Sequence, residues 1–161
     1  MVKTELKKIM ENQGNIFFTP LLEDLLQQDK LIQVSLSGLS MFPFLMHGDV
    51  VQIQSVTNEK LKRGAIVIYK NKDRWIAHRL IKTDVKKNLI YTRGDSRTVK
   101  DEPIIPEQIK GVVVKIVKSR WILAHLSIGK FAKVITFFSP VMAPVFGFIF
   151  FLLGKLKICI G

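Results

Sequence analysis

The sequence is poor in cysteine and histidine. Its single cysteine, Cys159, excludes an internal disulfide among the 161 residues. The three histidines, His47, His78 and His125, are far apart and lack the spacing of metal ligands. Internal repeats and low-complexity tracts are absent too, so the length indicates one domain that can bury a core. We therefore expect a fold without disulfides, and neither a metal site nor a cofactor.

Acidic residues are scarce relative to basic ones. The chain carries 13 Asp and Glu against 25 Lys and Arg, which gives a formal net charge of +12. Such an excess favours a polyanionic partner, either nucleic acid or an anionic membrane surface. Lysine predominates and no arginine-rich recognition helix is evident, so charge alone does not choose between them.

The first 18 residues lack the apolar run of a secretory signal or an N-terminal anchor. Residues 134–153, in contrast, form an uncharged stretch long enough to cross about 30 Å of hydrocarbon as a helix. Pro140, Pro144 and Gly147 would kink such a helix, and a buried hairpin is the alternative. Residues 119–133 mix apolar side chains with cations, which is typical of a helix in the headgroup zone of anionic lipid. The tail favours membrane association and suits a nucleic-acid partner badly.

The middle of the chain has the pattern of short strands. Thr19-Pro20 marks the start of an amphipathic helix that runs to about Lys30. Six β-branched, often alternating segments follow, at residues 31–36, 50–54, 65–70, 74–82, 88–93 and 111–117. We expect a mainly β fold: a coiled, largely antiparallel, barrel-like sheet over residues 31–118. An N-terminal helical segment (1–30) and a basic, then hydrophobic helical segment (119–161) flank it.

The stretch SGLSMFPFL at residues 37–45 contains candidate nucleophiles. Gly38 permits close backbone approach to a substrate, and Pro43 stiffens the turn that follows. Ser40 is the better candidate because it lies between them. Ser35 and Ser37 share its alternation, so periodicity alone leaves all three serines open.

A base and an acid could complete the site. His78, in the segment WIAHRLIK, could accept a proton at neutral pH, although a lone histidine in a strand more often simply packs in its sheet. Asp95 and Asp101 lie in RGDSRTVKDEP, and either carboxylate could orient the imidazole. Both also fit ordinary turns.

Taken in order, these segments resemble the type I signal peptidases and their relatives. The similar boxes are GLSMFPFLMHGD (38–49), KRGAIVIYK (62–70), AHRLI (77–81), RGDSRTVKDEP (93–103) and GVVVKIV (111–117). A histidine at the base position resembles the endoplasmic-reticulum, archaeal and sporulation branch, whereas the bacterial branch has lysine. Ala65 replaces the family's usual aspartate. The resemblance covers about residues 31–118.

The resemblance implies a role for each matching residue. Ser40 would be the nucleophile, His78 the general base and Asp101 the catalytic carboxylate. Gly38 and the N–H of Ser40 would form the oxyanion hole, and Asp95 would be a supporting carboxylate.

The implied substrate is the extended leader or signal peptide of a precursor, cut after small residues and bound as an added strand. Met41 and Phe42 are candidates for the substrate cleft. Cations before the apolar run outnumber those after it, so the positive-inside rule favours the cytoplasmic face of the cell membrane for the domain. A peptidase dedicated to one exported peptide, beside a transporter or another membrane subunit, would fit this topology.

Two alternatives share the motifs. Self-cleaving repressors have a similar serine box, but they use a lysine base and carry a DNA-binding domain, for which the roughly thirty-five residues before the box are too few. A non-catalytic, signal-peptidase-like membrane subunit is the other alternative, and Ala65 is the hint in its favour.

Overall fold

The computed structural model describes residues 24–26, 28, 30–57, 61–71 and 74–138, together with 141, 144, 145 and 148. The predicted helix before Lys30 lies mostly outside this part, and so does most of the apolar run 134–153. Within the described residues, none of the helices is long and apolar enough to span a bilayer.

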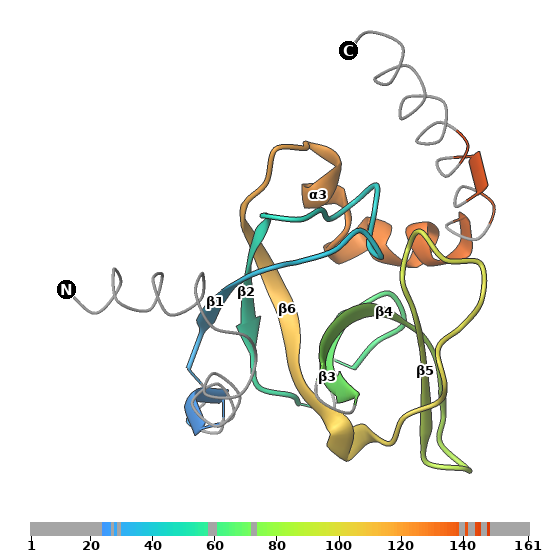
Figure 1. Cartoon of the computed structure of the whole chain (residues 1–161). Coiled ribbons are helices and arrows are strands. Elements are labelled where there is room, and N and C mark those ends of the chain that lie inside the picture. The colour runs from blue at the N-terminus through green and yellow to red at the C-terminus, as the bar shows by residue number, and fades with distance from the viewer. Residues whose placement is uncertain are drawn as a thin grey trace, which may run out of the picture.

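Six strands form one antiparallel sheet and confirm the prediction of a mainly β fold. They are β1 (Ile32–Ser35), β2 (Val50–Gln54), β3 (Ile66–Asn71), β4 (Arg74–Asp84), β5 (Leu89–Arg93) and β6 (Ile109–Lys118). Their order in the sheet is β1-β2-β6-β3-β4-β5, so the last strand in sequence lies between β2 and β3 (Figure 1). Each of the six strands falls on a segment that the sequence pattern predicts.

The sheet is buried on both faces at β3. Ile66 and Ile68 pack into one hydrophobic core with side chains of β1, β2 and β6. Val67 and Tyr69 alternate with them and pack into a second core with side chains of β4 and β5. This accounts for the almost continuous apolar sequence of β3, because a strand buried on both faces needs no polar side.

The sheet curls but does not close, so the expected barrel is corrected to an open, bent sheet. Register shifts occur in the β2–β6, β3–β6 and β4–β5 pairs, and such bulges bend a sheet. Over the described residues β1 and β5 remain the two edge strands. The outer edge of β5 is instead occupied by the following loop, since Ile90 and Ile104 exchange two backbone hydrogen bonds of 2.7 and 2.9 Å. A closing strand would need those same backbone groups.

The segment after β6 is helical but interrupted. A short 3-10 turn, η1 (Pro106–Gln108), precedes β6, and α3 (Leu123–Leu126) and η2 (Gly129–Phe131) follow it. The helix then continues over residues 132–138. The single amphipathic helix expected over 119–133 is therefore wrong in detail. The break follows α3: Ile128 is extended, and Gly129, with φ of +84°, has a left-handed conformation at the start of η2.

Candidate active site

His78 and Asp101 form the centre of the site. His78 is buried in β4, and its Nδ1 lies 2.6 Å from Oδ2 of Asp101. Asp101 belongs to the loop that covers the edge of β5, where its backbone N–H donates to the Thr92 carbonyl at 2.9 Å. The same loop that keeps the sheet open thus carries the carboxylate to the histidine.

Two hydroxyl groups that the sequence did not nominate donate hydrogen bonds to the carboxylate of Asp101. Thr92 Oγ1 donates to Asp101 Oδ2 at 2.8 Å, and the Tyr69 hydroxyl donates to the same oxygen at 3.3 Å. Tyr69 is buried with its ring 6.5 Å from that of His78, centroid to centroid. The sequence signal for Tyr69 is the alternation of side chains along β3. It places Tyr69 on the same face as Val67, which pairs with His78 on β4.

The surroundings of the carboxylate shift its pKa downwards. Burial alone would raise the pKa of Asp101, but the hydrogen bond and positive charge of His78 and the hydroxyl donors lower it below its ordinary value. Burial raises the pKa of Tyr69 to about 12, so its hydroxyl keeps its proton and remains a donor at neutral pH. Asp101 is therefore an ionised acceptor across the physiological range.

Ser40 and the other nitrogen of the imidazole, Nε2, both approach Gly94. A Cβ placed on the buried Gly94 would be 3.1 Å from both Ser40 Cβ and His78 Nε2, so these two atoms flank one glycine. The same Cβ would be 2.5 Å from the Ser40 carbonyl oxygen. Only a residue without a side chain fits between the serine loop and the histidine.

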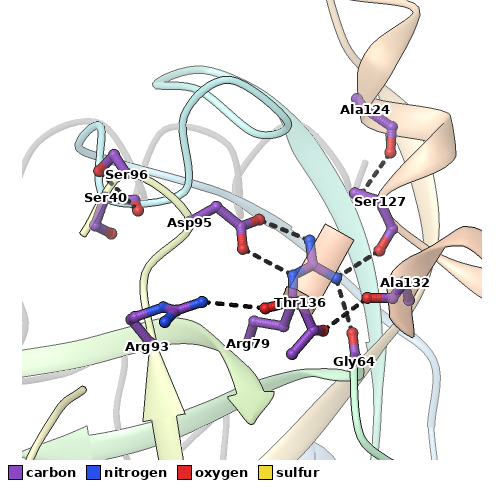
Figure 2. Close-up of polar contacts among 10 residues, drawn as sticks. All are labelled: Ser40, Gly64, Arg79, Arg93, Asp95, Ser96, Ala124, Ser127, Ala132 and Thr136. Carbon is purple, nitrogen blue, oxygen red and sulfur yellow. Dashed lines mark hydrogen bonds and ion pairs between the residues drawn. The ribbon is translucent and has the colours of Figure 1, made fainter. Parts of the chain in front are cut away.

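Ser96 joins the serine loop to the turn that follows β5. The Ser40 carbonyl accepts hydrogen bonds from the Ser96 N–H and from Ser96 Oγ, both 3.0 Å long (Figure 2). Ser96 Oγ also lies 3.0 Å from the Leu39 carbonyl oxygen. Sequence analysis missed Ser96, although it directly follows the Gly-Asp pair.

Backbone donors are available near the serine. Gly38 has φ of +88° and lines the same cavity as Ser40. Neither the N–H of Gly38 nor that of Ser40 donates a hydrogen bond to another described residue. Two such groups at one loop can stabilise a developing oxyanion.

Ser40, His78 and Asp101 all line a cleft of about 730 Å³. Ser37 and Met41 also line it, while Ser35, an exposed residue of β1, does not. Met41 is buried in the first core as well. Phe42 does not line the cleft: its buried ring packs edge-on against Trp121 at 6.3 Å between centroids. Of the two candidates for the substrate cleft, Met41 therefore lies at the cleft and Phe42 lies away from it.

Asp95 lies behind the cleft rather than in it. Its two carboxylate oxygens accept hydrogen bonds from Nε and Nη2 of Arg79 at 2.8 and 2.7 Å (Figure 2). Arg79 is fully buried, and its Nη1 also donates to the carbonyls of Gly64 and Ser127, each at 2.8 Å. Asp95 thus has a supporting position, directly before Ser96 in the chain.

Within the described part of the chain, no group of three or more His, Cys, Asp or Glu side chains is placed to hold a metal ion. Comparisons with protein-family models, with curated proteins and with solved structures give no match to this chain. The residues themselves must therefore support any assignment of function.

Proposed function

We propose that the protein is a serine endopeptidase that cleaves peptide bonds in the cleft between Ser40 and His78. The observation that carries this proposal is the His78–Asp101 pair, whose free imidazole nitrogen faces the loop of Ser40 across Gly94. A nucleophile, a base beside it and a carboxylate that orients the base are the parts that this chemistry requires.

Each residue has one step in the proposed reaction. Ser40 Oγ attacks the carbonyl carbon of the peptide bond while His78 Nε2 accepts the proton of the Ser40 hydroxyl. Asp101 accepts the Nδ1–H and stabilises the imidazolium that forms. The N–H groups of Ser40 and Gly38 donate to the oxyanion. His78 then protonates the amine that leaves, and a water molecule, deprotonated by His78, hydrolyses the acyl-enzyme.

The resemblance to signal peptidases suggests the substrate and the setting. The substrate would be the extended leader or signal peptide of an exported precursor, cut after small residues. The hydrophobic helical segment within 119–161 would associate with the cell membrane, where anionic lipid matches the basic charge. The charge bias favours the cytoplasmic face, beside a transporter or other membrane subunit. The alternative of a non-catalytic subunit predicts the same setting without cleavage.

The proposal is tested by cleavage of a peptide library in detergent or vesicles, with new termini identified by mass spectrometry. Ser40→Ala and His78→Ala should each reduce kcat/KM by about 10⁴-fold or more, because nucleophile and base act as one unit. Ser37→Ala is the matched control, since Ser37 lines the same cleft. Its activity should stay within a few-fold of wild type.

Two results would decide against the enzyme. Retained cleavage by Ser40→Ala would remove the nucleophile from the proposal. A folded wild-type protein that neither cleaves any library member nor reacts with a serine-directed probe would favour the non-catalytic subunit.

A further inference from the structure

A second hollow, of about 460 Å³, lies on the β4 side of the molecule and is distinct from the cleft. The residues that line this basic hollow are Arg63, Leu80, Ile81, Lys82, Thr83 and Lys100. Three of the six carry a positive charge and none carries a negative one. Such a hollow is complementary to a phosphate group, for which the cations supply charge and Thr83 an additional hydroxyl donor.

Among the residues that the structure describes, no carboxylate forms an ion pair with a cation of the basic hollow. No ion pair joins Arg63, Lys82 or Lys100 to another described residue. The ammonium groups of Lys82 and Lys100 instead lie 6.0 and 5.8 Å from the centroid of one aromatic ring, that of Tyr91. The two cations therefore line one hollow and each approaches the same ring.

The carboxylates next in sequence are engaged elsewhere. Asp84 follows Thr83, but its Oδ1 accepts a hydrogen bond from the Lys87 N–H at 3.2 Å. Asp101 follows Lys100, but it is held by His78, Thr92 and Tyr69. The positive charge of the hollow therefore remains available to a ligand.

An apolar helix adjoins the basic hollow. The turn that carries Arg63 packs directly on this helix, because a Cβ on Gly64 would lie 2.8 Å from the carbonyl carbon of Ala132. The strand β5 also contacts this helix, because Arg93 Nη2 donates to the carbonyl of Thr136 at 3.2 Å (Figure 2). The helix is thus fixed to the sheet next to the hollow.

The outer face of this helix is hydrophobic and exposed. Ala132, Ile135 and Thr136 are buried against the domain. On the outside, 51% to 67% of each side chain is exposed for Phe131, Val134, Phe137 and Phe138. The described residues Val141, Val145 and Phe148 continue this exposed set. A contiguous apolar face of this kind marks an interaction site rather than ordinary surface.

We propose that the basic hollow binds the phosphate of an anionic lipid headgroup while the apolar face of 131–138 inserts into the bilayer interface. A bilayer offers an anionic layer next to an apolar one, which matches a basic hollow whose Arg63 turn packs on the apolar helix. Lys100 lines both the hollow and the cleft, so a lipid bound there would hold the cleft at the membrane surface. This proposal does not depend on peptidase activity.

The test measures binding of the full chain to vesicles by flotation. One set contains equal parts of phosphatidylglycerol and phosphatidylcholine, and the other contains phosphatidylcholine alone. The triple variant Arg63→Gln/Lys82→Gln/Lys100→Gln should lose about fivefold in affinity per cation on the anionic vesicles, or about a hundredfold in total. Its weak binding to the neutral vesicles should not change.

A matched control removes three positive charges elsewhere. Lys30, Lys110 and Lys115 precede β1 or lie on β6, which β3 separates from β4. The variant Lys30→Gln/Lys110→Gln/Lys115→Gln should lose only a few-fold. Equal losses in the two triple variants would show that net charge rather than the hollow binds lipid, and would overturn the proposal.

Two further measurements isolate the contributions. Phe137→Ser/Phe138→Ser should weaken binding to both kinds of vesicle, whereas Ser40→Ala should bind like wild type even if it abolishes cleavage. Titration with inorganic phosphate tests a soluble ligand. If phosphate bound the hollow tightly and the basic triple variant kept full vesicle affinity, the ligand would be a soluble anion and the lipid assignment would fail.

Discussion

His78 and Arg79 are neighbours in sequence that face opposite sides of β4. Side chains alternate along a strand, so the imidazole reaches the cleft while the guanidinium enters the interior behind it. The same alternation on β3 puts Tyr69 beneath Asp101. At this scale strand geometry places His78 and Tyr69, and the groups around Asp101 and Tyr69 set the pKa of each.

Replacing Asp101 by asparagine should reduce kcat without unfolding the protein. The amide cannot stabilise an imidazolium and would favour the wrong imidazole tautomer, which costs up to about 10⁴-fold in the analogous serine protease triad. Asp84→Asn, a change of the same kind outside the cleft, is the control and should be neutral. A rise in KM with an unchanged kcat would contradict the orienting role of Asp101.

Acid should remove the contribution of Asp101 to stability. Its pKa in the folded protein is lowered from the ordinary 3.8, so above that pH the carboxylate is ionised in both states and its native hydrogen bonds count in full. As the pH falls below 3.8, the unfolded chain takes up the proton first, and the free energy of unfolding falls. Denaturant unfolding at stepped pH should therefore show a steeper acid loss for wild type than for Asp101→Asn. Parallel curves would exclude this linkage.

Three segments meet at the scale of the elements. The loop of residues 37–45 carries Ser40, β4 carries His78, and the chain after β5 supplies Gly94, Ser96 and Asp101. The two loops approach so closely that the carbonyl of Ser40 is hydrogen-bonded to Ser96 and leaves no room for a side chain at Gly94. The distance between nucleophile and base is therefore set by the packing of two loops on one strand.

Gly94→Ala should separate Ser40 from His78. The new methyl group would overlap the Ser40 carbonyl and touch His78 Nε2, and a displacement of about 1 Å can cost about 10²-fold in rate. Gly48→Ala provides the comparison, because its φ of +89° makes the change strained although nothing lies within 4 Å. Cleavage assays should show a large loss for Gly94→Ala alone. Similar activity in both variants would mean that the close approach is unimportant.

The buried ion pair of Arg79 and Asp95 joins several of the described segments. Arg79 connects β4 to the turn of Asp95, to the turn of Gly64 and to the segment of Ser127 that leads into the C-terminal helix (Figure 2). The side that carries the apolar helix and the side that carries the cleft therefore share a single guanidinium. Loss of its partner should affect both.

Asp95→Asn should destabilise the fold rather than the chemistry. It leaves a fully buried guanidinium without its counter-charge, which costs about 3–5 kcal/mol in comparable pairs. Denaturant unfolding should show this loss in full, while the remaining folded protein should keep most of its kcat. Asp84→Asn should shift the free energy of unfolding by less than about 0.5 kcal/mol. A kcat that collapsed in a stable Asp95→Asn protein would instead give Asp95 the orienting role.

The sequence alone determined the elements and nominated the site. Short, β-branched and often alternating segments located all six strands, since the burial of side chains on one or both faces is reflected in the order of residues. Local chemistry nominated three serines, one histidine and two aspartates, and the resemblance to signal peptidases selected Ser40, His78 and Asp101 among them. The structure places these three residues at one cleft.

Only the tertiary structure decided what depends on pairing between distant segments. Whether the sheet closes depends on the loop of Asp101 occupying the edge of β5, and the C-terminal helix is interrupted where Ile128 is extended and Gly129 left-handed. The hydroxyls of Tyr69 and Thr92, the tether of Ser96 and the basic hollow each bring together residues far apart in the chain. Side-chain periodicity reports which face a residue occupies but not which residue it meets there, and that information arises only when the strands pair.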